Sequence, residues 1–183
     1  MNLTFNVERL LLPISVDLQD KLIQIAKQQN KLTPSICALT FNFRDSSYSA
    51  ESGGWHPVEI RIEQESGQWH FNYITDFSYV GYPYPELAKE VDFDFDNGLA
   101  TFMFMPPQSI SEVDVMDFYQ VWEMNFLAYV EMEAFDEIKI AAESWWGFER
   151  QEQDRSTNLA LIHNKRLRIN PRGSSDDEVA LVV

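Results

Sequence analysis

The alternation of apolar and polar residues near the start of the chain predicts a helix followed by a strand. From Val16 to Gln29 the apolar residues recur every three or four positions, which places them on one face of a helix. Ser15 or Asp17 is suited to cap the first turn. From Cys37 to Arg44 the period becomes two, which is typical of a strand with one buried face.

The middle of the chain predicts two hairpins. Residues 58–63 and 69–77 alternate around a Glu-Ser-Gly turn, and residues 91–95 and 99–105 flank an Asn-Gly pair that readily adopts positive φ. The Gly-Tyr-Pro-Tyr-Pro segment at 81–85 cannot continue a central strand, because proline donates no ladder hydrogen bond. Since residues 99–105 are apolar on both faces, we expect them at the centre of the sheet, covered on both sides for part of their length.

The last periodic segments predict a second helix and leave one segment ambiguous. Ser109 and Glu112 have capping-box spacing, and the pattern is helical to about Phe135. This 109–135 helix has two apolar lines, so it is either wedged between the sheet and another layer or makes a subunit contact. Residues 137–143 form either a last edge strand or an extension of that helix. We expect residues 147–183 to be weakly ordered or disordered, because periodicity fades there.

These elements predict one α+β domain over residues 1–146, with a mostly antiparallel sheet of five or six strands and two helices packed mainly on one face. A chain of 183 residues with 45% hydrophobic and 14% aromatic residues can build one core of this size. The opposite face of the sheet should carry the polar positions of the alternation: Thr40, Asn42, Arg61, Glu63, Asn72 and Asp92.

The charge pattern limits the partners. The net charge is −15, and the whole acidic excess lies within residues 1–147. This argues against direct nucleic-acid binding, which needs basic groups on the protein. A solvated surface explains the charge most simply; the functional alternative is an acidic protein that imitates nucleic acid to engage a partner with a basic surface.

Cysteine content and hydropathy indicate where in the cell the protein is located. Cys37 is the single cysteine, so no internal disulfide is possible, and its place on a strand predicts a buried, inert thiol. No apolar run approaches the roughly 18 residues that span a bilayer, and the N-terminus lacks the pattern of a secretory signal. We therefore expect a cytoplasmic protein without membrane contact.

The motif search is mostly negative. The chain has no phosphate-binding glycine loop, dinucleotide fingerprint, nucleophile elbow or paired-cysteine site, so we expect no cofactor, and enzyme activity is uncertain. The 92–98 segment begins like a calcium loop, but its glycine is one place late and Met103 replaces the closing glutamate. His56, His70 and Glu59 are the only pieces for a histidine-containing metal site. Without a strong third ligand signal, we expect no metal there.

The loop between the strands at 37–44 and 58–63 holds the candidate site. A functional interpretation uses an arginine to bind an anion, a carboxylate as base and two aromatic rings for stacking. A structural interpretation is favoured, in which Arg44 pairs with a nearby acid, serine and aspartate side chains satisfy the turn, and Trp55 closes the end of the core. The candidate ligand-binding residues are Arg44, Asp45, Tyr48, Glu51, Trp55 and His56.

The segment from Phe41 to Ile60, FNFRDSSYSAESGGWHPVEI, resembles the signature of a small bacterial domain family with no assigned function. The resemblance covers about residues 15–145. It implies a single α+β domain and supplies no activity, ligand or catalytic residue.

Two functions therefore compete on sequence grounds. The favoured one is a noncatalytic binding or protein-interaction module, which the 109–135 helix would allow to dimerise. The alternative is a small enzyme or small-ligand-binding domain that uses the Arg44–His56 loop. It predicts a concave pocket where Arg44, Tyr48, Trp55 and His56 converge.

Overall fold

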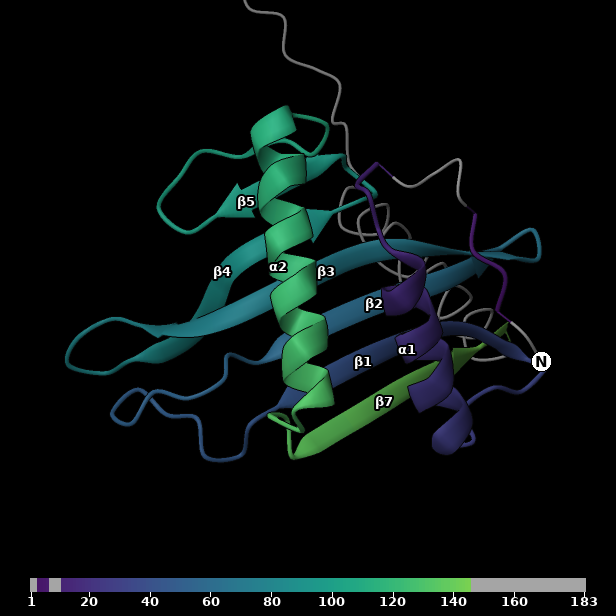
Figure 1. Cartoon of the computed structure of the whole chain (residues 1–183), viewed down its shortest axis with the longest axis horizontal. Helices are drawn as coiled ribbons and strands as arrows, with labels where there is room; N and C mark the ends of the chain where they lie inside the picture. Colours follow the sequence, from purple (N-terminus) through teal and green to yellow (C-terminus); the bar gives the residue numbers. More distant parts are fainter. Residues whose placement is uncertain (1–2, 7–10, 146–183) are drawn as a thin grey trace, which may run out of the picture. The chain divides into compact units, whose positions relative to one another are not determined.

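The computed structural model describes residues 3–6 and 11–145, which form a seven-stranded antiparallel sheet and two helices (Figure 1). The α+β prediction is confirmed, but five or six strands was too few. The additional strand has only two residues, too short for any periodic signal. Along the sheet the order is β6-β5-β4-β3-β2-β1-β7, and the strands are β1 (Ile36–Arg44), β2 (Val58–Glu65), β3 (Gln68–Val80), β4 (Glu86–Asp94), β5 (Leu99–Phe102), β6 (Gln108–Ser109) and β7 (Glu137–Ser144).

Helix α1 (Val16–Gln28) forms where the sequence predicts it. The Ser15 side chain caps it by accepting a hydrogen bond from the Leu18 amide at 3.0 Å. The predicted apolar stripe is the buried face: Leu18, Leu22, Ile25 and Ala26. Both helices lie over the same face of the sheet in Figure 1.

Helix α2 (Val113–Glu131) starts later than the sequence predicts. Ser109 belongs to β6, and Glu112 occupies the N-cap position without a side-chain cap bond. The two residues do interact, since the Ser109 amide donates to Glu112 Oε1 at 3.3 Å, but this contact stabilises the turn before the helix. The outer side of α2 exposes Val121 and Met124 by 55% and 63%. In the described part of the chain, Val121 and Met124 are therefore left uncovered, whereas Met116, Leu127 and Val130 of the same helix pack against the core.

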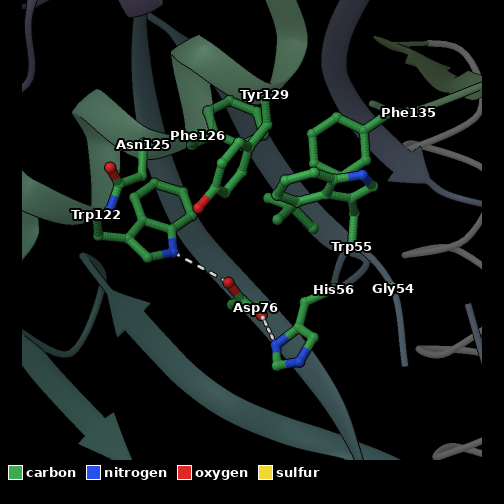
Figure 2. A pocket seen from close by; sticks show the side chains of 10 residues that line it. Gly54, Trp55, His56, Asp76, Trp122, Asn125, Phe126, Tyr129 and Phe135 are labelled. Carbon is green, nitrogen blue, oxygen red and sulfur yellow. Dashed lines mark hydrogen bonds and ion pairs between the residues drawn. The ribbon is translucent and has the colours of Figure 1, made fainter. Parts of the chain in front are cut away.

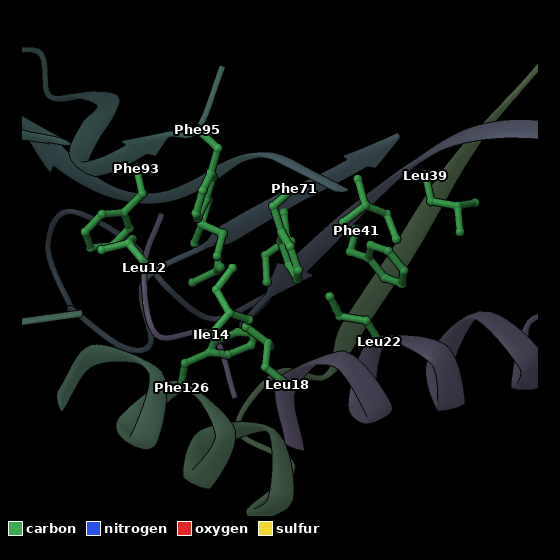
Figure 3. Packing of buried hydrophobic residues seen from close by; sticks show 14 of the residues in the cluster. Leu12, Ile14, Leu18, Leu22, Leu39, Phe41, Phe71, Phe93, Phe95 and Phe126 are labelled. Carbon is green, nitrogen blue, oxygen red and sulfur yellow. The ribbon is translucent and has the colours of Figure 1, made fainter. Parts of the chain in front are cut away.

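The core fills the space between the sheet and the two helices (Figure 3). Alternate residues of β1 supply its centre, where Leu39, Phe41 and Phe43 are fully buried. Phe43 meets Phe126 of α2 edge to face, with ring centroids 4.9 Å apart. Each large apolar side chain buried in this way contributes about 1.5 to 3 kcal/mol.

Two segments settle questions about the sheet. Residues of β7 pair with β1 from Ile36 opposite Ser144 to Arg44 opposite Glu137, so the 137–143 segment is an edge strand and does not extend α2. Strand β5 is short and lies next to the outermost strand, so a central place for 99–105 is wrong. The chain leaves the sheet at Phe104, which has a φ of 64° and is 95% exposed.

Three β-bulges alter which residues share a face of the sheet. The register skips one residue in each of three strands: Cys37 of β1 opposite β7, Asn72 of β3 opposite β2 and Glu90 of β4 opposite β3. A bulge bends its strand and redirects the side chains around it. At the first, Cys37 is buried as predicted, but its neighbour Ile36 joins the hydrophobic core instead of it.

The bulge at Asn72 reverses the alternation along the rest of β3. Asn72 is buried and donates to Asp96, so it does not lie on the polar face as predicted. After it, Ile74 belongs to the core. Asp76, two residues further, pairs with the buried Val58 and Val91. An acidic side chain is thereby turned toward the helix layer.

The opposite face carries a network of polar side chains. Arg61 donates to Thr40 at 3.1 Å and pairs with Glu63 and Glu143 at 2.6 and 2.7 Å. These carboxylates raise the pKa of Arg61, which keeps the guanidinium charged. Asn42 donates to Glu59 in the same network. The prediction of a polar face is confirmed for these residues.

Two further expectations from the sequence concern the C-terminal segment and membrane-spanning helices. The weakly ordered or disordered segment expected at 147–183 lies outside the described residues. Within the described ranges, none of the helices has both the length and the apolar character needed to cross a membrane.

Candidate functional site

The loop after β1 is organised by the Asp45 carboxylate. It accepts hydrogen bonds from the Ser47 amide at 2.9 Å and from the Trp55 amide at 3.1 Å, and also from the Ser47 hydroxyl. These bonds lower the pKa of Asp45, and the hydrogen bond from the Ser47 side chain has the largest effect. Asp45 therefore serves the backbone of the turn, as the structural interpretation of the loop expects.

Gly54 allows this closure. Its φ of 134° is a conformation that side chains disfavour, and a Cβ there would lie 2.7 Å from Asp45 Oδ2. Because no such atom is present, the carboxylate reaches across the loop to the Trp55 amide. Trp55 then lies toward Tyr129 of α2, and His56 lies beside Asp76 of β3 (Figure 2).

A pocket of about 340 Å³ lies between this loop, the sheet and α2. Its walls are largely aromatic: the Trp55 ring packs on Tyr129 at 4.3 Å between centroids, and Trp122 stacks on Phe126 at 5.3 Å. Its volume and aromatic lining are typical of small-ligand sites. The full lining consists of Gly54, Trp55, His56, Val58, Asp76, Trp122, Asn125, Phe126, Tyr129 and Phe135.

Asp76 is the acidic group of the pocket. Its Oδ2 accepts a hydrogen bond from Trp122 Nε1 at 3.1 Å, and its Oδ1 lies 3.2 Å from His56 Nδ1 (Figure 2). Its side chain is 17% exposed. Burial raises the pKa of Asp76, and although Trp122 and His56 oppose this, the charge of Glu90 adds to the increase.

His56 also contacts a second carboxylate. Its Nδ1 lies 2.8 Å from Glu90 Oε2. The Glu90 side chain comes from the bulge in β4, so the two bulges bring two acids to one imidazole. The Tyr48 ring packs against His56 at 5.2 Å, and the Tyr48 hydroxyl accepts a hydrogen bond from the Tyr79 amide. Tyr48 thus holds the imidazole from the side of β3.

The loop residues singled out from the sequence have different places. Trp55 and His56 line the pocket, and Tyr48 supports His56 without lining it. Three others do not line it: Asp45 holds the turn, and Arg44 and Glu51 are exposed. The predicted convergence of Arg44, Tyr48, Trp55 and His56 on one pocket is therefore wrong for Arg44 and Tyr48.

The metal-ligand candidates are also separated. Glu59 accepts hydrogen bonds from Asn42 and Tyr73 in the polar network of the sheet. His70 pairs with Glu63 in the register of β2 and β3. Neither belongs to the group around His56, which contains Asp76 and Glu90. In the 92–98 segment, Asp94 bonds to Asn97, as in an ordinary hairpin turn.

Comparison with protein families places the chain. Residues 16–141 match the model of the family described as "Protein of unknown function (DUF2787)". The chain belongs to this family. The match agrees with the resemblance inferred from residues 41–60. None of the curated proteins matches the chain.

Two solved structures of Vibrio cholerae proteins resemble this DUF2787 chain. A hypothetical protein from the VSP-II pathogenicity island is 42% identical, with a TM-score of 0.68, over 76% of this chain and 100% of its own. A conserved hypothetical protein from pathogenicity island VPI-2 is 45% identical, with a TM-score of 0.63, over 71% of this chain and 95% of its own. The latter is described as sharing structural homology with the human P32 protein.

Sequence reasoning missed most of the pocket of this family member. Asp76 falls on the polar phase of the apparent alternation at 69–77, and only the bulge turns it to the helix side. Glu90 was missed for the same reason, because the bulge in β4 sets the direction of its side chain. The two apolar lines of α2 gave a signal for its aromatic residues, but did not show which of them meet the loop. The residues missed are Asp76, Glu90, Trp122, Asn125 and Tyr129.

Proposed function

We propose that this domain is a noncatalytic module that binds a small planar ligand between the 45–57 loop and α2. The observation that carries the proposal is the pocket of about 340 Å³, with aromatic walls and the Asp76 carboxylate at one side. Pockets of roughly 300 to 1,000 Å³ with apolar walls and a few polar groups are the usual form of small-ligand sites.

The lining supports a ligand with a flat ring and a polar edge. Indole and phenol rings bind flat groups by offset stacking, which adds about 0.5 to 1.5 kcal/mol to the effect of burial. Asn125 and the Tyr129 hydroxyl can each donate and accept hydrogen bonds. Figure 2 places the Tyr129 hydroxyl and the Asp76 carboxylate on the side of the pocket where Trp122 lies.

The same lining favours binding over covalent catalysis. Among the described residues that line the pocket there is no serine, threonine, cysteine or lysine. A hydroxyl, thiol or amine nucleophile of these four types is therefore missing from the lining. His56 held by Asp76 is an arrangement that general bases use, so an enzyme acting through proton transfer is the alternative function.

Filling the pocket tests the proposal. Indole, quinoline and adenine are titrated as probes into the full-length protein, and the indole N–H signals of Trp55 and Trp122 are followed by NMR. We expect at least one probe to shift both signals in the wild type. Asn125→Phe places a ring in the cavity and should weaken that binding at least tenfold.

Val121→Phe is the matched control, because it adds the same ring to the exposed outer side of α2. It should bind the probes like the wild type. If none of the probes shifts the two indole signals, or if Asn125→Phe and Val121→Phe behave alike, the pocket is not the binding site.

The outer side of α2 supports a second proposal, a homodimer. Val113, Val121 and Met124 are exposed by 66%, 55% and 63% and lie along one helix. Exposed apolar side chains that gather in this way often mark a protein contact. The net charge of −15 also supports a partner protein with a basic surface.

The protein's location is a separate proposal. The chain has a single cysteine and so no cysteine pair, which suits a cytoplasmic location.

A further inference from the structure

Three potential metal ligands meet at the edge of the pocket. His56 Nδ1 lies 3.2 Å from Asp76 Oδ1 and 2.8 Å from Glu90 Oε2, and one ligand atom from each residue lies within 4.8 Å of the others. Zn²⁺ binds nitrogen and oxygen at about 2.0 to 2.2 Å, so neighbouring ligand atoms are roughly 2.8 to 3.5 Å apart. The two distances from Nδ1 agree with this spacing.

The charges of the group also suit a cation. Two carboxylates approach the same ring nitrogen, and a single N–H proton there cannot make a strong hydrogen bond to both. Glu90 Oε2 is shielded from solvent and, apart from this contact, has no hydrogen-bond partner among the described residues. A divalent cation between the three atoms would neutralise both carboxylates and satisfy this oxygen.

The surrounding residues hold the ligands in place. Trp122 Nε1 donates to Asp76 Oδ2, which leaves Oδ1 for the side of His56. Tyr48 packs on the imidazole and is itself bonded to the Tyr79 amide. Outer contacts of this kind fix the orientation of metal ligands, and their loss typically weakens metal affinity about 10- to 100-fold.

We propose that His56, Asp76 and Glu90 form a binding site for a divalent transition-metal cation, with Zn²⁺ as its best fit. One imidazole and two carboxylates suit Zn²⁺, whereas Mg²⁺ and Ca²⁺ prefer ligand sets made only of oxygen. His56 and Asp76 also line the pocket, so the cation would have an open coordination position on that side. The site does not depend on what occupies the aromatic part of the pocket.

A metal titration tests the site without any organic ligand. Full-length protein is stripped with a chelator and titrated with Zn²⁺ by calorimetry at neutral pH, and Co²⁺ is used to record the absorption of the bound ion. We expect one equivalent of Zn²⁺ to bind and to raise the Tm. His56→Ala, Asp76→Asn and Glu90→Gln should each weaken binding at least tenfold, and Trp122→Phe about tenfold.

The other two histidines of the chain provide matched controls. His70→Ala and His163→Ala should bind Zn²⁺ like the wild type. Glu90 has a half-exposed side chain, so Glu90→Gln tests the site even if another variant fails to fold. Absence of saturable binding, equal losses in the controls and the three ligand variants, or tighter binding of Mg²⁺ or Ca²⁺ than of Zn²⁺ would each overturn the proposal.

Discussion

At the scale of residues, the ionised carboxylate of Asp76 lowers the stability of the folded protein. Its carboxyl group is largely buried, and burial raises its pKa in the folded protein above the ordinary value of 3.8. The folded state therefore favours the protonated form more than the unfolded state does. Stability from this difference is present at low pH and is lost as the pH rises through the raised pKa.

This gives a prediction for Asp76→Asn in metal-free protein. An asparagine can still accept the hydrogen bond from Trp122, but it does not ionise. The stability of the wild type relative to the variant should fall as the pH rises above about 4 and level off above the raised pKa. A tenfold difference in proton affinity between the folded and unfolded states corresponds to about 1.4 kcal/mol. Urea unfolding between pH 4 and pH 8 measures the difference.

Asp45→Asn is the control of opposite sign. Hydrogen bonds lower the pKa of Asp45, so its stabilising effect is present at neutral pH and is lost as the pH falls through the lowered value. The stability of the wild type relative to this variant should therefore decrease toward acid pH. Parallel pH profiles for the two variants would contradict the assignment of Asp76 as the destabilising carboxylate.

At the scale of elements, Glu123 connects the two helices. It is 6% exposed in the middle of α2, accepts the Ser15 amide at 3.2 Å and accepts the Tyr119 hydroxyl. Ser15 is the N-cap of α1, where the partial positive charge of a helix end favours a carboxylate. Burial and the nearby Glu123 charge raise the pKa of Tyr119, which keeps its hydroxyl a donor.

Removal of this link should destabilise the domain. Glu123→Ala leaves the Ser15 amide and the Tyr119 hydroxyl without their acceptor, and we expect a loss of about 2 to 3 kcal/mol. The measurement is the free energy of unfolding in urea. Glu131→Ala, on the exposed end of the same helix, should change it by less than about 0.5 kcal/mol. Equal losses for the two variants would show that the buried hydrogen bonds of Glu123 are not the cause, since alanine itself favours a helix.

Elements also show where the sequence pattern is informative. Helix α1 and the part of strand β1 from Leu39 to Arg44 follow it closely, because each buries one face and keeps a regular period. The start of α2 and the end of β5 do not, because tertiary contacts and a positive φ at Phe104 end the pattern early. Local periodicity predicts the kind of element better than its limits.

At the scale of the whole molecule, the uncovered side of α2 determines the expected assembly. If it forms the proposed homodimer, Met124→Glu should convert the dimer to a monomer, since a charge would be buried in the contact. Light scattering of the full-length protein at several concentrations measures the mass. Val16→Glu, an exposed apolar position on α1, should leave it unchanged. A wild type that is monomeric throughout would remove the dimer from consideration.

The sequence alone determined that this is an acidic chain with an α+β fold, an antiparallel sheet, two helices and a distinctive loop at 42–56. These properties follow from composition and from local periods of two and 3.6 residues, which each stretch of chain expresses by itself. It also placed Trp55 and His56 in the candidate site, because both stand in that loop.

Only the tertiary structure decided what these residues meet. A bulge depends on the register between two strands, and no period within one strand reveals it. The bulges at Asn72 and Glu90 turn Asp76 and Glu90 toward His56, and the packing of α2 on the sheet brings Trp122 to Asp76. The pocket and the proposed metal ligands come from segments far apart in the chain, so their geometry exists only once the sheet has formed.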